Sequence, residues 1–185
     1  MVTPEMTSGV GVKAGTDLSI TLNNRLSIVP GIYWEMRNKV FDEHSSTGKD
    51  RHARDINHYI SVPVRLGVRL FGSSSSDVSG SILAGPYVSY GLGGTSRYRI
   101  TKDGVTTNFS YDAFSKESQC PERFDYGVNA AFNLLIRQHF IVGVNTEFGF
   151  KHIYQTHNLI ADFAFSFFPG ASTHLALGLN LGYRF

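Results

Sequence analysis

Residues 174–185 read HLALGLNLGYRF, and their character alternates strictly along the chain. Leucine or an aromatic residue occupies every odd position, whereas small, polar or charged residues occupy every even position. Successive side chains of a β-strand point to opposite faces, so this period of two predicts a strand with one face in an apolar medium. Two structures satisfy the pattern: a strand of a membrane barrel, and the last strand of a soluble sandwich or barrel that ends in phenylalanine.

Length and composition exclude several classes of protein. A chain of 185 residues is most simply one domain, spanning residues 1–185. Charged residues make up 17% of it, and no apolar run approaches the ~18 residues of a transmembrane helix, which excludes a helical membrane protein. A net charge of +2 is too small to indicate nucleic-acid binding. The single cysteine, Cys120, excludes an internal disulfide framework and a cysteine-based zinc site.

Seven further segments alternate in the same way as residues 174–185. Tight turns are predicted at Asn23-Asn24 and at Arg137-Gln138, and irregular loops at residues 41–57 and 95–122. Within the second loop, Asp103-Gly104 predicts a projecting hairpin over residues 98–111. Sequential hairpins without helix signals predict an all-β fold, an eight-stranded antiparallel up-and-down barrel. The eight predicted strands are residues 9–22, 25–39, 58–70, 80–94, 123–136, 139–153, 158–168 and 174–185.

The composition of the polar face indicates which face of the strands lines the barrel interior. A soluble, lipocalin-like barrel would place its apolar face inside. Here the polar face is rich in glycine, which leaves room for long neighbours in a narrow interior, and its charges nearly balance. We therefore predict a transmembrane barrel with a polar, filled interior. The predicted interior charge network is Lys13, Asp17, Glu35, Arg37, Arg65, Arg69, Asp125, Glu147, Lys151, Asp162 and Arg184.

The apolar face carries aromatic residues that fall near the same ends of their predicted strands. Such a cluster is typical of the aromatic girdle at a membrane interface, although aromatic residues are also common in strands generally. The predicted girdle is Trp34, Tyr90, Phe124, Tyr126, Phe150, Tyr183 and Phe185.

Five segments carry a resemblance to a known family. They are LSIVPGIYW (26–34), HYISVPVRL (58–66), AGPYVSYG (84–91), FDYGVNA (124–130) and GYRF (182–185). Together they resemble the PorT-like outer-membrane β-barrel proteins of Bacteroidetes, a Gram-negative group. The resemblance implies an outer-membrane location, contact with outer-membrane lipid, and recognition of the terminal strand by the barrel assembly machinery. It implies no established activity, and it implies one more strand before residue 9. Because residues 1–9 lack the features of a signal peptide, we expect a processed or trimmed chain.

The sequence contains only weak candidates for catalytic or ligand-binding residues. His44, His52 and His58 lie near acidic residues in the first predicted loop, which is compatible with a metal site but more typical of a solvated loop. His44-Ser45-Ser46 is a minor candidate for a hydrolase or acyltransferase. Arg97, Arg99 and Lys102 are compatible with contacts to acidic sugar or phosphate groups.

We therefore expect a non-enzymatic outer-membrane protein without a cofactor or bound metal. Its barrel would be an anchor, and its polar loops would meet a surface ligand. The alternatives are an outer-membrane enzyme that modifies lipid or lipopolysaccharide, and a soluble ligand-binding barrel. Whether any pore conducts, as in porin-like barrels, is left open by the sequence.

The predicted strand count has a consequence for orientation. With eight strands and long connections after the second and fourth, both chain ends lie at the rim of the long loops. We therefore predict that Phe185 lies at the rim of loops 41–57 and 95–122. Outer-membrane barrels normally place the long loops and the C-terminus on opposite sides, so this expectation is unusual.

Overall fold

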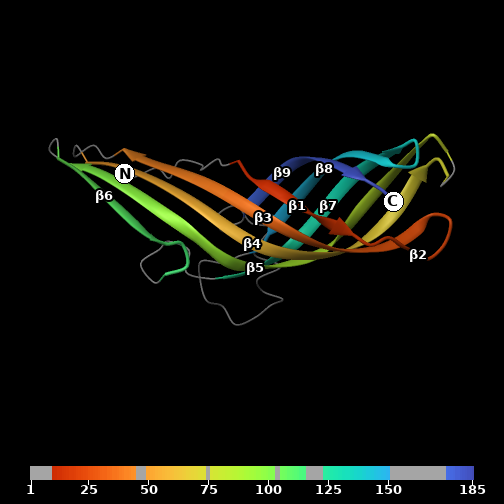
Figure 1. Ribbon diagram of the computed structural model, residues 1–185, viewed down its shortest axis with the longest axis horizontal. Helices are drawn as coiled ribbons and strands as arrows, with labels where there is room; N and C mark the ends of the chain where they lie inside the picture. Colours follow the sequence, from red (N-terminus) through yellow and green to blue (C-terminus); the bar gives the residue numbers. More distant parts are fainter. Residues whose placement is uncertain (1–9, 45–48, 74–75, 103–104, 116–122, 151–173) are drawn as a thin grey trace. The chain divides into compact units, whose positions relative to one another are not determined.

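All regular secondary structure in the described residues is β-strand (Figure 1). The computed structural model describes residues 10–44, 49–73, 76–102, 105–115, 123–150 and 174–185. No helix in these ranges is long and apolar enough to cross a membrane. The strands are β1 (Val12–Asp17), β2 (Ile20–Thr21), β3 (Leu26–His44), β4 (Lys49–Phe71), β5 (Val78–Lys102), β6 (Val105–Asp112), β7 (Phe124–Ile136), β8 (Phe140–Gly149) and β9 (His174–Tyr183).

The described strands form one sheet in the order β1-β3-β4-β5-β7-β8-β9, with β2 paired to β3 and β6 paired to β5. Neighbours in the sheet follow one another along the chain, as an up-and-down antiparallel arrangement requires. The all-β antiparallel fold class predicted from the sequence is thus confirmed. The path contains seven described strands, and the seventh predicted strand, residues 158–168, lies outside the described residues.

The chain divides into two compact units, each treated separately below. Unit 1 comprises Met1–Gly15, Tyr33–Ser61 and Ser89–Phe124, and unit 2 comprises Thr16–Ile32, Val62–Val88 and Asp125–Phe185. Strands β1, β3, β4, β5 and β7 contribute residues to both units. The prediction of one domain over residues 1–185 stays a prediction.

In unit 1 the strands extend through most of the sequence predicted to be loop. β3 continues to His44 and β4 begins at Lys49, so the loop predicted over residues 41–57 is wrong. β5 likewise continues to Lys102 and pairs with β6, from Thr95↔Asp112 to Lys102↔Val105. This pairing confirms the hairpin around Asp103-Gly104 and shortens the loop predicted over residues 95–122. The extensions of β3 and β4 over residues 39–44 and 49–55 have no alternation of apolar and polar residues, which is why periodicity did not reveal them.

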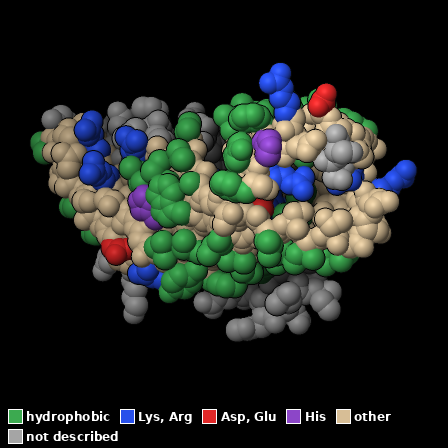
Figure 2. Space-filling view, turned by 45° about the vertical axis from the view of Figure 1, so that its right-hand side comes forward, with side chains coloured by type: hydrophobic (Ala, Val, Ile, Leu, Met, Phe, Trp, Pro, Cys, Tyr) green, Lys and Arg blue, Asp and Glu red, His purple; other side chains and the backbone are tan. Residues whose placement is uncertain are grey.

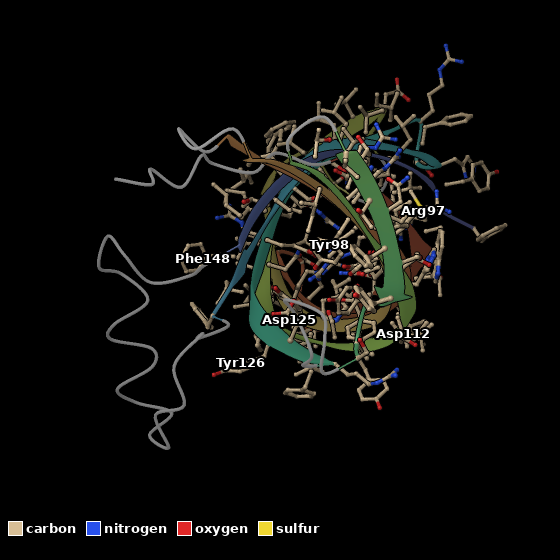
Figure 3. The ribbon with its side chains drawn as sticks, turned by 90° about the vertical axis from the view of Figure 1, so that its left-hand side faces the viewer. Arg97, Tyr98, Asp112, Asp125, Tyr126 and Phe148 are labelled. Carbon is tan, nitrogen blue, oxygen red and sulfur yellow. The ribbon has the colours of Figure 1, made fainter. Side chains whose placement is uncertain are left out.

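The alternation of β5 shifts by one residue at Gly93-Gly94. Before the two glycines, the even-numbered Tyr90 and Leu92 are exposed, whereas after them Ser96 is buried and Arg97 is exposed. A shift of this kind is the effect of a β-bulge, in which one extra residue reverses the two faces of a strand. Beyond the bulge, Arg97 therefore points outward and Tyr98 inward (Figure 3).

Both predicted turns are present in unit 2, and they are stabilised in different ways. Arg137 and Gln138 have φ values of 48° and 64°, and the His139 N–H donates to the Ile136 carbonyl over 3.2 Å. Both residues thus occupy the left-handed region that a tight hairpin requires. At the other turn, the side-chain oxygen of Asn23 accepts hydrogen bonds from the backbone N–H groups of Arg25 and Leu26, both at 2.8 Å.

The C-terminal strand corrects the predicted orientation. β9 pairs directly with β8, from Gly149↔His174 to Phe140↔Tyr183, and the Arg184 N–H donates to the His139 carbonyl at 2.7 Å. The end of the chain therefore lies beside the Arg137-Gln138 turn. The prediction that Phe185 lies at the rim of the long connections is wrong, because it counted one strand between β8 and β9.

Polar and apolar residues occupy the two faces that the alternation predicted. Along β4, Ser61 and Arg65 are buried while Val62, Val64 and Leu66 are exposed. Along β7, Asp125 points to the inner side and Tyr126 to the outer side (Figure 3). This distribution is the reverse of a soluble domain, in which charged residues are almost never fully buried.

Candidate functional site

The inner side of unit 1 holds an ion cluster around Glu35, which is 3% exposed. Its carboxylate accepts from the Lys13 ammonium at 2.7 Å and from the Arg37 guanidinium at 2.8 and 3.0 Å. Lys13 also lies over the ring of Tyr33, and Arg37 over that of Tyr59, at 4.6 and 4.5 Å. The two cations and one anion form a paired cluster, which a buried charge requires.

Phe114 fills the inner side of unit 1 beside this cluster. Its ring packs edge-to-face against Tyr59 at 5.7 Å, and the Arg123 guanidinium lies over it at 5.0 Å. A turn after β6 directs Phe114 inward, because the Asp112 carboxylate accepts the Phe114 N–H at 2.8 Å and the Gly94 carbonyl accepts the Ala113 N–H at 3.2 Å. The ring occupies the space that a side chain at Gly91 would need.

The inner side of unit 2 holds a second set of polar contacts. Arg65, 6% exposed, forms an ion pair with Asp17, and Arg69 donates to the Asn24 carbonyl at 3.1 Å. Further contacts join Tyr87 to Asp125 at 3.4 Å, Asn129 to Glu147 at 3.1 Å and Asn180 to Asn133 at 2.6 Å.

These contacts show where the predicted interior residues lie. Lys13, Glu35 and Arg37 come together in unit 1, and Asp17 and Arg65 in unit 2. Arg184 is exposed at the end of the chain, outside these clusters, while Lys151 and Asp162 lie outside the described residues. Among the side chains that the structure describes, no group of three metal-ligating residues converges. None of the described interior contacts has the order of nucleophile, base and orienting acid.

The outer side of unit 2 is apolar, and that of unit 1 carries both apolar residues and exposed arginines. Exposed leucine, isoleucine and valine residues follow one another on the outward positions of β3, β4, β5, β8 and β9, and Leu177, Leu179 and Leu181 are 80–86% exposed. Figure 2 shows hydrophobic side chains over much of the visible face. Soluble monomers rarely expose contiguous apolar patches above a few hundred Å².

The predicted aromatic girdle does not lie at one rim. In unit 2, Tyr126 packs against Phe150 at the end of β7 and β8 remote from the Arg137-Gln138 turn. Tyr183 instead packs against Phe140 and Phe185 at the turn itself. The error has the same cause as that of Phe185, because one strand too many reversed the direction assigned to β9. Trp34, Tyr90 and Phe124 are exposed members of unit 1.

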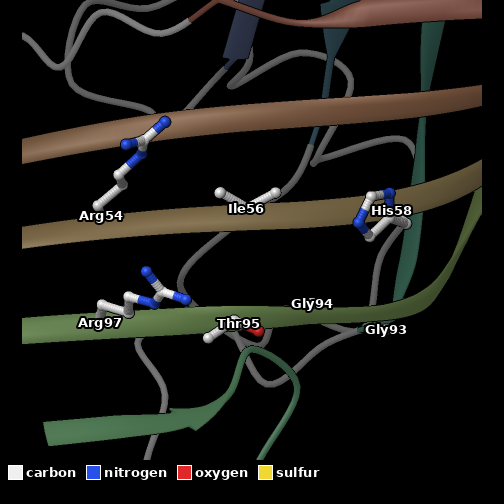
Figure 4. Close-up of a pocket in the computed structure, with 7 residues that line it drawn as sticks. All are labelled: Arg54, Ile56, His58, Gly93, Gly94, Thr95 and Arg97. Carbon is white, nitrogen blue, oxygen red and sulfur yellow. The ribbon is translucent and has the colours of Figure 1, made fainter.

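Unit 1 also has an outward pocket of about 350 Å³ between β4 and β5 (Figure 4). β4 supplies Arg54, Ile56 and His58, and β5 supplies Gly93, Gly94, Thr95 and Arg97. His58 stacks on Trp34 with ring centroids 5.5 Å apart and planes 18° apart. The sequence marked His58 as a possible metal ligand and Arg97 as a possible anion contact. The sequence did not show that His58 and Arg97 lie close together, because it does not reveal the strand register beyond the bulge.

Comparison with known proteins gives one match. A family model described as an outer membrane protein beta-barrel domain matches residues 3–155. No curated protein and no solved structure matches the chain.

Proposed function

The chain belongs to the outer membrane protein beta-barrel domain family, and on this premise we propose that it is a non-enzymatic transmembrane barrel with a surface-interaction role. Family membership implies an outer-membrane location. The narrower likeness to PorT-like barrels of Bacteroidetes, and the closure of the sheet into a barrel, are part of the proposal.

The observation that carries the proposal is the reversal of the two faces. Val64, 47% exposed, and Arg65, 6% exposed, are neighbours on β4, and the same alternation recurs on β5, β7 and β8. Water would not stabilise an outward face of this kind, whereas the hydrocarbon of a bilayer matches it. Ion pairs and hydrogen bonds join several of the inward polar groups, among them Glu35 to Lys13, Arg65 to Asp17 and Asn129 to Glu147.

Strand length supports a role at the surface. A membrane-spanning strand needs about 9–11 residues, whereas β3, β4 and β5 have 19, 23 and 25 residues. We propose that the excess, with the β5–β6 hairpin, forms a β-structured extension that meets a partner outside the membrane. This extension replaces the long polar loops expected from the sequence.

Orientation follows from the short turns. Outer-membrane barrels have short periplasmic turns and longer extracellular connections. We propose that the Asn23-Asn24 and Arg137-Gln138 turns and Phe185 face the periplasm, where the assembly machinery would meet β9. The β5–β6 hairpin would then face outward from the cell.

The proposal is tested by refolding the purified protein with and without detergent. We expect a folded monomer only in detergent, and a gel band of unboiled protein that migrates differently from that of boiled protein. Protection of the strands from added protease should depend on detergent or lipid in the same way. A monodisperse folded monomer in detergent-free buffer would refute the membrane-spanning proposal.

A further inference from the structure

We propose that the outward pocket of Arg54, His58 and Arg97 binds the phosphate group of a membrane lipid. The inference rests on the proposed function, because it needs this face to lie against a bilayer. The pocket lies in unit 1 and has a volume of about 350 Å³, within the range of small-ligand sites.

The first support is the position of the two arginines. A side chain at Gly94 would meet the Ile56 carbonyl and the Asn57 side chain, which places Gly94 across from this part of β4. β4 and β5 are consecutive neighbours joined by a short connection, so they run antiparallel. Arg54 lies just before Ile56 on β4, and Arg97 lies just after Gly94 on β5. Because the strands run antiparallel, the two arginines lie across from each other on the outward face. Both line the pocket (Figure 4).

Two like charges on facing strands are mutually unfavourable, and an anion between them removes this repulsion. Both arginines are exposed, and neither guanidinium forms an ion pair or hydrogen bond with any side chain that the structure describes. Arg99, the next outward arginine on β5, differs because its Nε donates to the Asn108 side chain at 3.4 Å. Arginine binds phosphate well, because its planar donors match two phosphate oxygens at once.

The second support is the apolar surface beside the pocket, because it favours a lipid over other phosphate-containing ligands. Trp34, stacked on His58, is itself exposed, and Leu92 precedes the bulge with an exposed side chain. Along β4 the outward residues are Val64, Val62, Ile60, His58, Ile56 and Arg54, so polar and charged side chains enter the apolar row only at His58 and Arg54. Aromatic residues mark the level of the lipid headgroups, and basic pockets next to apolar surface bind such headgroups. A ligand with a phosphate and an acyl chain would satisfy both parts of this surface.

Trp34 provides a specific reporter, since it is the only tryptophan of the chain and stacks on a pocket residue. The full chain, refolded in zwitterionic micelles, is titrated with phosphatidic acid while the Trp34 emission is recorded. Phosphatidylcholine with the same acyl chains and inorganic phosphate are titrated in parallel. Native mass spectrometry counts the lipid molecules that remain bound.

We expect a saturable change with phosphatidic acid and much weaker responses to the other two ligands. Arg54→Gln and Arg97→Gln should each raise the Kd for phosphatidic acid about tenfold, as expected for the loss of a charge-assisted contact. Arg99→Gln is the matched control, because it removes the same charge from the same face of β5 outside the pocket, and it should change the Kd less than about twofold.

Equal effects of Arg97→Gln and Arg99→Gln would overturn the proposal, since only the general charge would then matter. Phosphatidylcholine binding as tight as phosphatidic acid would overturn the phosphate assignment, and equally tight inorganic phosphate would overturn the lipid assignment. The absence of both a fluorescence change and a bound lipid would also overturn it. Folding without detergent refutes the barrel itself, whereas a detergent-dependent barrel with an Arg97-independent response refutes the pocket alone.

Discussion

Substitution of Gly91 tests whether the Phe114 ring fills a space that exists only because residue 91 has no side chain. A Cβ added at Gly91 would overlap the Phe114 ring, with the Cε1 and Cε2 atoms at 2.6 and 2.9 Å. At Gly93, two residues along β5, an added Cβ has nothing within 4 Å. Gly91→Ala and Gly93→Ala therefore make the same chemical change on one strand, with and without a steric conflict.

The expected magnitudes follow from packing. Gly91→Ala should lower the free energy of unfolding by about 1–3 kcal/mol, because the ring must move away from Tyr59 and Arg123. Phe114→Ala should cost about 3–5 kcal/mol, since a buried aromatic side chain is lost. In the Phe114→Ala background the conflict at Gly91 disappears. There Gly91→Ala should be neutral or gain up to about 1 kcal/mol, because glycine disfavours a strand.

The assay is urea unfolding in micelles, followed by the emission of Trp34 and by the gel mobility of unboiled protein. A double-mutant cycle of Gly91→Ala and Phe114→Ala should give a coupling energy of about 1–4 kcal/mol, the difference between the effects of Gly91→Ala in the two backgrounds. Gly93→Ala should leave the midpoint unchanged or raise it slightly. Additive effects of the two substitutions, or equal losses for Gly91→Ala and Gly93→Ala, would refute the packing of Phe114 against β5.

Three further predictions concern the faces, a turn and the end of the chain. Val64→Arg should destabilise the protein in lipid vesicles by about 2–4 kcal/mol, the cost of arginine on a lipid-facing strand near mid-membrane. Arg65→Ala should cost less, because Asp17, with 32% of its side chain exposed, regains water; the reverse order of unfolding midpoints would mean that the faces are inverted. Gln138→Gly should raise the free energy of unfolding by about 0.5–1 kcal/mol, because it relieves a left-handed backbone at φ 64°. Gln138→Ala should give no gain, and a gain from alanine equal to that from glycine would exclude backbone strain as the cause. Deletion of Phe185, whose side chain is fully exposed, should leave the unfolding midpoint of refolded protein unchanged but lower the amount assembled in cells; a lowered midpoint in vitro would show a structural role instead.

Alternation of side chains was sufficient to locate the strands that carry both an apolar and a polar face. The predicted segments at 123–136 and 174–185 differ from β7 and β9 by two residues or fewer at each end. The same pattern gave the burial of Glu35, Arg65, Asp125 and Glu147, because a fixed period of two assigns each residue to a face. The outer-membrane family of the chain agrees with the resemblance read from five short segments.

Alternation failed where no apolar face was present. Residues 39–44 and 49–55 have no alternation of apolar and polar residues, so only backbone pairing defines the end of β3 and the start of β4 as strands. The bulge at Gly93-Gly94 was also missed, since a one-residue shift leaves no mark of its own in a stretch of glycines. These two features create the pocket of Arg54, His58 and Arg97, which is why the sequence did not group these residues.

The sequence by itself determined the fold class, the positions of the amphipathic strands and the polar character of the inward face, because each depends on the local geometry of one strand. Only the tertiary structure decided that β8 and β9 are direct neighbours, at which end the chain terminates, and which residues meet across strands. The direct pairing of β8 with β9 reversed the predicted position of Phe185, and the packing of Phe114 against Gly91 joined residues 23 positions apart. Such relations depend on strand pairing and register, which hydrogen bonds between distant segments fix and which no single segment encodes.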